Sequence, residues 1–182
     1  KMTAYILMAV IAYLIGSISF SVIISKKMAG FDVREKGSGN AGSTNVLRTV
    51  GKKAAVITLI CDVLKGVIAI LIAMIIGNIF KNVDKELIVQ IAGIAVVLGH
   101  TFPIFFGFKG GKGVATSLGV LLMSNWQIGL ICLVFALVCV SMVTSTDVVE
   151  ASILKLNKTS LTIYVGKNST LKVSGTSKKV TW

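Results

Sequence analysis

Residues 54–80 read AAVITLICDVLKGVIAILIAMIIGNIF, a run in which Asp62 and Lys65 are the only charged side chains. A helix needs about 20 mostly apolar residues to cross a hydrocarbon core about 30 Å thick. Further apolar runs occupy residues 3–25, 87–106 and 114–144, the last interrupted at Ser124-Asn125-Trp126. The pattern predicts an all-α polytopic membrane protein with about four to five transmembrane helices.

The outer two apolar runs need individual interpretation. The run at residues 3–25 is longer than the apolar core of a signal peptide, and only Lys1 supplies a basic residue before it. Because further spans follow it, we expect a first transmembrane helix. Residues 114–144 are too long for one straight span, so we expect a short segment that ends at Ser124 and a second helix from Trp126 to about Val143. Trp126 suits a membrane–water interface.

Composition excludes several classes of function. Apolar residues make up 54% of the chain and charged residues 14%, unlike a soluble domain. The net charge of +12 lies largely in loops without interleaved aromatic residues, so we expect no nucleic-acid binding. Cys61, Cys132 and Cys139 lie in apolar runs without a CxxC motif, so we expect no metal site, disulfide framework or other cofactor.

Charge in the loops predicts the orientation of the chain. The loop at residues 26–53 carries Lys26, Lys27, Arg34, Lys36, Arg48, Lys52 and Lys53 against Asp32 and Glu35, whereas residues 81–86 are nearly neutral. The positive-inside rule therefore places this first loop in the cytoplasm and the amino terminus outside. The loop at residues 108–113 then faces the cytoplasm too.

The first loop contains GSGNAG at residues 37–42, which has the glycine spacing of a dinucleotide-binding motif. That motif must follow a β-strand, and here it follows a membrane span. Glycines still allow backbone N–H groups to approach an anion, and Arg48 offers a planar fork for phosphate. We expect phosphate binding, with a flexible loop that only sets topology as the alternative. The expected residues are Gly37, Ser38, Gly39, Asn40, Thr44, Asn45 and Arg48.

The second loop reads FKGGKGVAT at residues 108–116, and its spacing is not that of a Walker A motif. Its glycines and lysines precede a helical run, and phosphate binds well at a helix amino terminus. The alternative is an ordinary cytoplasmic turn. The expected phosphate-binding residues are Lys109, Gly110, Gly111, Lys112, Gly113 and Thr116.

Three ionisable residues lie within or near the spans. His100 is the only histidine of the chain; we favour a structural residue that binds a loop, with a catalytic base as the alternative. Asp62 and Lys65 lie three residues apart on one helix face and are expected to pair. The other spans offer almost no ionisable groups, which disfavours a transporter.

Several motifs together resemble the bacterial acyl-phosphate:glycerol-3-phosphate acyltransferases. They are GSISF at residues 16–20, residues 30–48, DVLKG at residues 62–66, and GHTFP at residues 99–103 followed by residues 108–116. The resemblance covers about residues 4–140, with Ser19 and Ser43 where the family usually has proline and alanine. It implies a multi-pass protein of the bacterial inner (plasma) membrane. It also implies acyl transfer from acyl phosphate to the 1-hydroxyl of sn-glycerol 3-phosphate, which forms lysophosphatidic acid for phospholipid synthesis without a cofactor.

The resemblance also implies roles for individual residues. Ser38 and Arg48 would be the essential pair of the first loop, and Lys112 with the second-loop glycines would hold glycerol 3-phosphate beside Lys109. The partners implied are acyl phosphate, glycerol 3-phosphate and membrane lipids. Catalysis would rest on positioning and charge stabilisation, with a substrate phosphate taking the hydroxyl proton.

The carboxyl-terminal tail is a different kind of sequence. Residues 147–182 are polar and β-prone, and residues 156–182 resemble the start of a bacterial group 2 immunoglobulin-like domain. We therefore expect a membrane acyltransferase-like domain at residues 1–146 and an incomplete β segment at 147–182. The family's third signature, with histidine, asparagine and arginine, has no match after His100. The alternative functions are an inactive truncated or chimeric remnant, or a membrane anchor that displays an adhesive β domain.

Overall fold

The structure, a computed structural model, describes residues 1–138. Within them the elements are α1 (Met2–Gly16), α2 (Phe20–Ala29), η1 (Val33–Glu35), α3 (Ser43–Thr49), α4 (Lys52–Ile79), α5 (Lys85–Thr101), η2 (Ile104–Phe106) and α6 (Val114–Ser124). A further apolar helix spans Trp126–Val138. These residues contain no strand, which confirms the all-α prediction for them. The predicted β-prone tail, the boundary at residue 146 and Cys139 lie outside the described residues.

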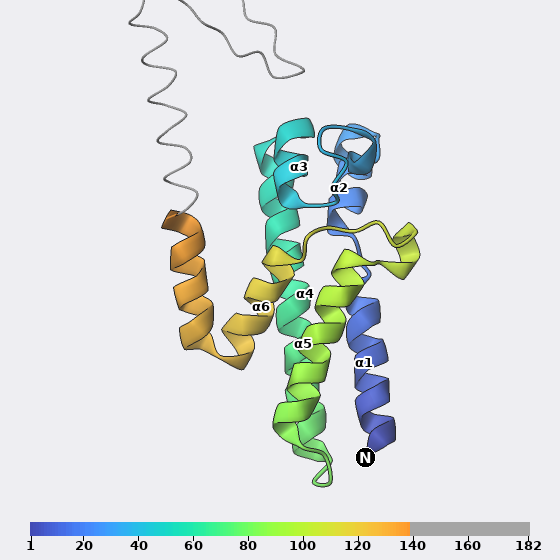
Figure 1. Cartoon of the computed structure of the whole chain (residues 1–182). Helices are drawn as coiled ribbons and strands as arrows, with labels where there is room; N and C mark the ends of the chain where they lie inside the picture. Colours follow the sequence, from blue (N-terminus) through green and yellow to red (C-terminus); the bar gives the residue numbers. More distant parts are fainter. Residues whose placement is uncertain (139–182) are drawn as a thin grey trace, which may run out of the picture. The chain divides into compact units, whose positions relative to one another are not determined.

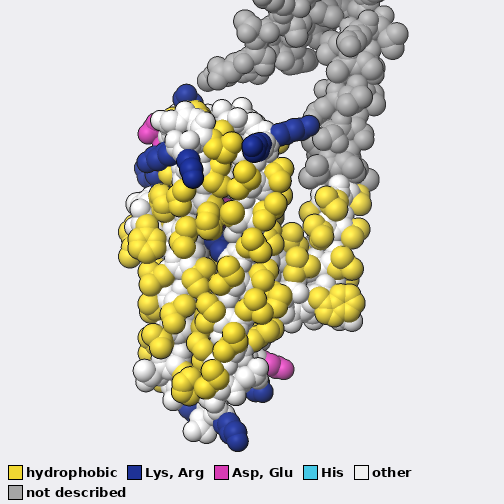
Figure 2. Space-filling view, turned by 180° about the vertical axis from the view of Figure 1, so that it is seen from behind, with side chains coloured by type: hydrophobic (Ala, Val, Ile, Leu, Met, Phe, Trp, Pro, Cys, Tyr) yellow, Lys and Arg dark blue, Asp and Glu magenta, His cyan; other side chains and the backbone are white. Residues whose placement is uncertain are grey.

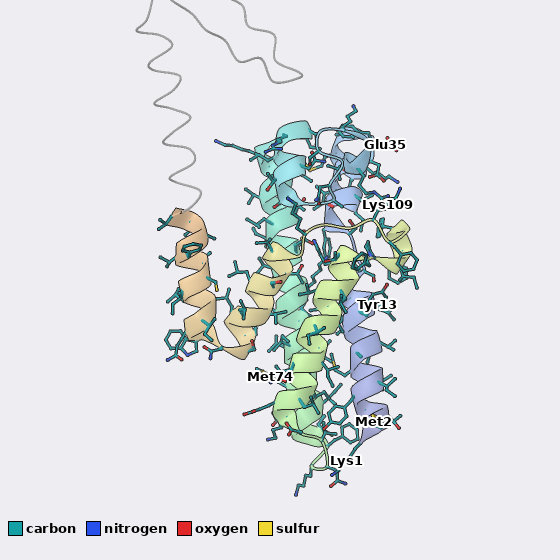
Figure 3. All side chains as sticks on the ribbon, viewed as in Figure 1. Lys1, Met2, Tyr13, Glu35, Met74 and Lys109 are labelled. Carbon is teal, nitrogen blue, oxygen red and sulfur yellow. The ribbon has the colours of Figure 1, made fainter. Side chains whose placement is uncertain are left out.

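Among residues 1–138, three segments are long and apolar enough to cross a membrane: Met2–Ala29, Lys52–Ile79 and Lys85–Phe106. Large apolar side chains such as Ile75 and Ile94 are exposed along them, as suits contact with lipid. Figure 2 shows this apolar surface between two ends at which Lys and Arg side chains gather. In Figure 3 the labelled Lys1 and Met2 lie at one end, and Glu35 and Lys109 lie at the other. The predicted polytopic membrane architecture is thereby confirmed.

The first span is not the single helix that the sequence predicted over residues 3–25. α1 ends at Gly16 and α2 begins at Phe20, so the backbone is broken between them. The Lys65 ammonium donates hydrogen bonds to the Gly16 carbonyl at 3.0 Å and the Ile18 carbonyl at 2.9 Å. Carbonyl groups freed by a helix break need such partners at membrane depth. The break is therefore stabilised by a side chain from α4.

Close helix packing positions the ends of α5 and α6. α4 lies beside α5 and α6, and α1 packs along α5 (Figure 1). A Cβ atom added at Gly66 would overlap the Thr116 carbonyl, and one added at Gly119 would overlap the Val63 carbonyl. Small residues allow membrane helices to approach this closely. The start of α6 is consequently held against the middle of α4.

Two helix ends follow from local sequence. α5 ends at Thr101 because Pro103 disfavours helical backbone at the residue before it, and Phe102 has φ −124° and ψ 67°. The predicted interruption of the last run is confirmed, since α6 ends at Ser124 and the next helix starts at Trp126. The Asn125 side-chain oxygen accepts a hydrogen bond from the Ile128 backbone N–H at 3.1 Å, as expected for a helix amino-terminal cap.

Candidate active site

The first loop is organised around the buried amide of Asn45. Its Nδ2 donates to the backbone carbonyls of Val33 at 2.8 Å, Lys36 at 3.0 Å and Asn40 at 3.0 Å. Its Oδ1 accepts a hydrogen bond from the Ser38 backbone N–H at 3.0 Å. The side chain is 2% exposed, so its polar atoms had to be satisfied within the protein. Asn45 thus holds the loop in one shape and presents Ser38.

The glycines of this loop permit that shape. Gly37 and Gly39 have φ angles of 62° and 72°, in the left-handed region that favours glycine. A Cβ atom at Gly37 would also overlap the side-chain oxygen of Asn45. These two glycines therefore act on the loop backbone and do not line the cavity described below.

The second loop folds back onto the end of α5. The backbone N–H of Gly110 donates to the Thr101 carbonyl at 3.1 Å, and that of Gly111 donates to the His100 carbonyl at 3.2 Å. A Cβ atom at Gly111 would collide with the imidazole of His100. Gly110 and Gly111 therefore complete the end of α5 with the N–H groups that the sequence assigned to phosphate. Gly113, with a φ of 79°, precedes the first residue of α6.

A cavity of about 350 Å³ lies where the two loops, α3, α4, α5 and the start of α6 meet. It combines two cationic side chains, several hydroxyl and amide groups, and the first residues of α6. Its lining residues are Ser38, Asn40, Gly42, Ser43, Thr44, Asn45, Arg48, Asp62, His100, Lys112, Gly113, Val114 and Ala115. The two loops that the sequence singled out thus form one site.

The structure brings the three expected catalytic residues, Ser38, Arg48 and Lys112, to this cavity. The expected phosphate-binding residues Asn40, Thr44, Asn45 and Gly113 line it too. Six others do not line it: Gly37, Gly39, Lys109, Gly110, Gly111 and Thr116.

The supporting residues and some unexpected ones complete the site. Asp62 and His100 reach the cavity wall, whereas Lys65 does not. The residues that sequence reasoning missed are Gly42, Ser43, Val114 and Ala115. Val114 and Ala115 could have been predicted, because a helical run starts directly after the second glycine-rich loop.

The cavity carries unbalanced positive charge. Within residues 1–138, neither the Arg48 guanidinium nor the Lys112 ammonium has an ion-pair or hydrogen-bond partner. The Asp62 carboxylate is paired with Lys65 at 3.0 Å, so it does not compensate them. The amino terminus of α6 adds a partial positive charge at the same wall. The site therefore favours a doubly charged anion such as a phosphate monoester.

Behind this wall lies a buried cluster of ionisable residues. The predicted pair of Asp62 and Lys65 is confirmed, and both side chains are 3% exposed. His100 Nδ1 lies 3.5 Å from Asp62 Oδ1, and the His100 carbonyl binds the second loop through Gly111. The backbone of His100 thus contacts a loop, as a structural residue would, while its side chain faces the carboxylate. Within residues 1–138 no three His, Cys, Asp or Glu side chains form a metal-binding group.

A second ion pair stiffens the first loop outside the spans. The Asp32 carboxylate accepts hydrogen bonds from Arg34 Nη2 at 2.8 Å, Arg34 Nε at 3.0 Å and the Arg34 backbone N–H at 3.0 Å. These bonds hold the pKa of Asp32 at about 2, below its ordinary value of 3.8. The same contact raises the pKa of the Arg34 guanidinium.

This shift predicts a specific pH dependence. A carboxyl group whose pKa is lower in the folded protein stabilises it above the unfolded pKa, and this contribution disappears as the pH falls from about 4 towards 2. The difference in thermal unfolding midpoint between the unsubstituted chain and Asp32→Asn should therefore be largest above about pH 4 and shrink below it. Unfolding in detergent micelles across this range measures it. Glu35→Gln, a change at an exposed carboxylate of the same loop, is the control; a difference for Asp32→Asn that is independent of pH contradicts the prediction.

Comparison with known proteins identifies the family of this chain. The family model described as glycerol-3-phosphate acyltransferase matches residues 6–173. The glycerol-3-phosphate acyltransferase of Clostridioides difficile (strain 630) is 54% identical over 136 residues, which cover 74% of this chain and 66% of the relative. That of Thiobacillus denitrificans is 50% identical over 129 residues, which cover 71% and 64%. The chain thus spans about two thirds of the length of these relatives.

Solved structures show the same relation. The crystal structure of PlsY (YgiH), an integral membrane glycerol 3-phosphate acyltransferase, in its glycerol 3-phosphate form has a TM-score of 0.60 and 44% identity to this chain. The match covers 70% of this chain and 60% of PlsY. The lysophosphatidic acid form gives a TM-score of 0.58 and 42% identity. From the matched family model, the sequence identities and the shared fold, this chain belongs to the glycerol-3-phosphate acyltransferase family.

Proposed function

We propose that this chain transfers an acyl group from acyl phosphate to the 1-hydroxyl of sn-glycerol 3-phosphate and so forms lysophosphatidic acid for phospholipid synthesis. The observation that carries the proposal is the cavity in which both glycine-rich loops meet and in which Arg48 and Lys112 lack counter-charges among the described residues. Membership of the family and the likeness to PlsY support the same reaction.

The phosphate of glycerol 3-phosphate is the first ligand of this cavity. Arg48 can offer two parallel N–H groups to phosphate oxygens, and Lys112 adds a compact charge. The free backbone N–H groups at the start of α6, at Val114 and Ala115, complete the anion site. Together these groups replace the water that a phosphate dianion loses on entering the cavity.

The acyl donor has a second, adjoining space. An apolar cavity of about 670 Å³ is lined mainly by side chains of α4 and α3, among them Leu47, Val56 and Leu59. Ser43 and Thr44 line both cavities. A molecule with a phosphate head and an acyl tail can therefore occupy both at once, with its reacting carbonyl near these two residues. This arrangement favours acyl phosphate as the donor.

The reaction then needs orientation and charge stabilisation. The 1-hydroxyl oxygen attacks the acyl carbonyl carbon, a C–O ester bond forms, and the bond from that carbon to the phosphate oxygen breaks. The departing inorganic phosphate takes the hydroxyl proton, so the protein itself supplies no base. The phosphates of both substrates share this cationic cavity, so Arg48 and Lys112 also stabilise the departing charge, and the exposed Ser38 hydroxyl donates a hydrogen bond there.

The location of the reaction follows from the charge of the loops. We assign the protein to the bacterial inner (plasma) membrane, with membrane lipids around its apolar surface and both loops on the cytoplasmic face. Glycerol 3-phosphate reaches the cavity from the water, while the acyl donor reaches it from the lipid.

The experiment that tests this function uses the full chain reconstituted in lipid vesicles. Acyl phosphate and labelled glycerol 3-phosphate should yield labelled lysophosphatidic acid, and vesicles without protein should yield none. Calorimetry with glycerol 3-phosphate accompanies the assay. Folded protein that binds glycerol 3-phosphate without forming product would be an inactive remnant, and protein that neither binds nor reacts would refute the proposal altogether.

A further inference from the structure

Arg34 differs from Arg48 in how its guanidinium is used. Its Nε and Nη2 atoms donate to the two carboxylate oxygens of Asp32 at 3.0 Å and 2.8 Å. Its Nη1 atom donates to the Phe106 carbonyl at 2.6 Å and to the Lys109 carbonyl at 3.1 Å. A guanidinium has five N–H groups, and four are engaged here. Arg34 therefore has little capacity left for a phosphate.

The position and charge of Arg34 lead to the same conclusion. The residue does not line the cavity, and it is paired with the adjacent Asp32 carboxylate, which Lys26 also contacts at 3.5 Å. Asp32 is itself anchored, since it is buried and accepts the Arg34 backbone N–H. The guanidinium is thus fixed in the first loop, with one edge directed at the second.

The contacts of Arg34 join two segments that are 72 and 75 residues apart in the chain. In the part of the chain that the structure describes, these are the hydrogen bonds that connect the first loop, residues 30–42, with residues 104–113. From Lys109 the chain continues to Lys112 and the start of α6, both of which line the cavity. Arg34 therefore contributes to the spacing of the cavity walls, together with the hydrogen bonds of Gly110 and Gly111 to the end of α5.

We propose that Arg34 is a positioning residue that ties the second glycine-rich loop to the first and thereby sets the separation of Arg48 and Lys112 across the cavity. The effect of Arg34 on the binding of glycerol 3-phosphate rests on the function proposed above, whereas its effect on the position of the second loop does not. Lysine cannot replace it, because a single ammonium cannot engage a carboxylate with two parallel bonds and also reach two carbonyls.

Amide hydrogen exchange in lipid vesicles tests the tie directly. In Arg34→Gln, amides of residues 106–113 should exchange at least about tenfold faster, because two charge-assisted hydrogen bonds are lost. Amides in α4 should keep their rates. Arg34→Lys should also loosen residues 106–113, although it retains the charge. Lys36→Gln is the matched control: it removes a cation of the same loop, which stacks on Phe31 at 3.8 Å, and should change nothing in the second loop.

Kinetics supply the second measurement. With the loop displaced, Lys112 is misplaced both for phosphate binding and for charge stabilisation, so kcat/KM for glycerol 3-phosphate should fall at least about tenfold in Arg34→Gln and stay within about twofold in Lys36→Gln. Unchanged exchange at residues 106–113 would overturn the inference, and so would faster exchange spread equally over α4 and α5. If the unsubstituted chain proves inactive, the proposed function fails, but the exchange result still decides whether Arg34 holds the loop.

Discussion

Arg48→Ala is expected to lower kcat/KM for lysophosphatidic acid formation by at least about a hundredfold, since removal of one preorganised charged donor typically costs this much. Arg48 lines the cavity and, among the described residues, has no protein partner that competes for its guanidinium. The kcat/KM of Arg48→Lys should lie between those of the unsubstituted chain and of Arg48→Ala, because lysine keeps the charge but lacks the planar fork of arginine. Initial rates with reconstituted protein measure the effect.

The matched control for this prediction is Lys27→Ala. Lys27 is an exposed cation in the last turn of α2 that does not line the cavity, so its loss changes the net charge equally. The activity of Lys27→Ala should stay within about twofold of that of the unsubstituted chain, as expected for a screened surface charge. Activity of Arg48→Ala within about threefold of the unsubstituted chain would remove Arg48 from the site.

Lys65→Met is expected to cost about 3–5 kcal/mol of folding free energy, because it leaves the Asp62 carboxylate buried without its partner. The change also removes the donor to the Gly16 and Ile18 carbonyls where α1 breaks. The midpoint of denaturant unfolding in detergent micelles measures the loss. Lys53→Met, at an exposed lysine in the first turn of the same helix, should stay within about 0.5 kcal/mol.

A double variant separates the two effects of Lys65. In Asp62→Asn combined with Lys65→Met no charge remains buried, so part of the lost stability should return. The remainder reports on the unpaired carbonyls at the break between α1 and α2. If the single and double variants were equally stable, the buried carboxylate would not be the source of the loss.

Within the site, the structure brings together residues that the sequence singled out by their type. Arg48, Lys112 and Ser38 were singled out because cations and hydroxyl groups beside glycines bind phosphate, and all three line one cavity. Gly110 and Gly111, in contrast, donate their N–H groups to carbonyls at the end of α5. A glycine-rich loop that binds an anion and one that packs against a helix end have the same local sequence.

Sequence alone was sufficient for the apolar spans, the interruption at Asn125 and the pair of Asp62 and Lys65. Transfer into lipid is nearly additive over residues, and a spacing of three places two side chains on one helix face. The break after Gly16 and the tie through Arg34 required the fold, because their partners lie 49 and 72 residues away. A hydrogen bond across such a separation exists only after helices pack, and packing is set by the shape of all contacting surfaces together.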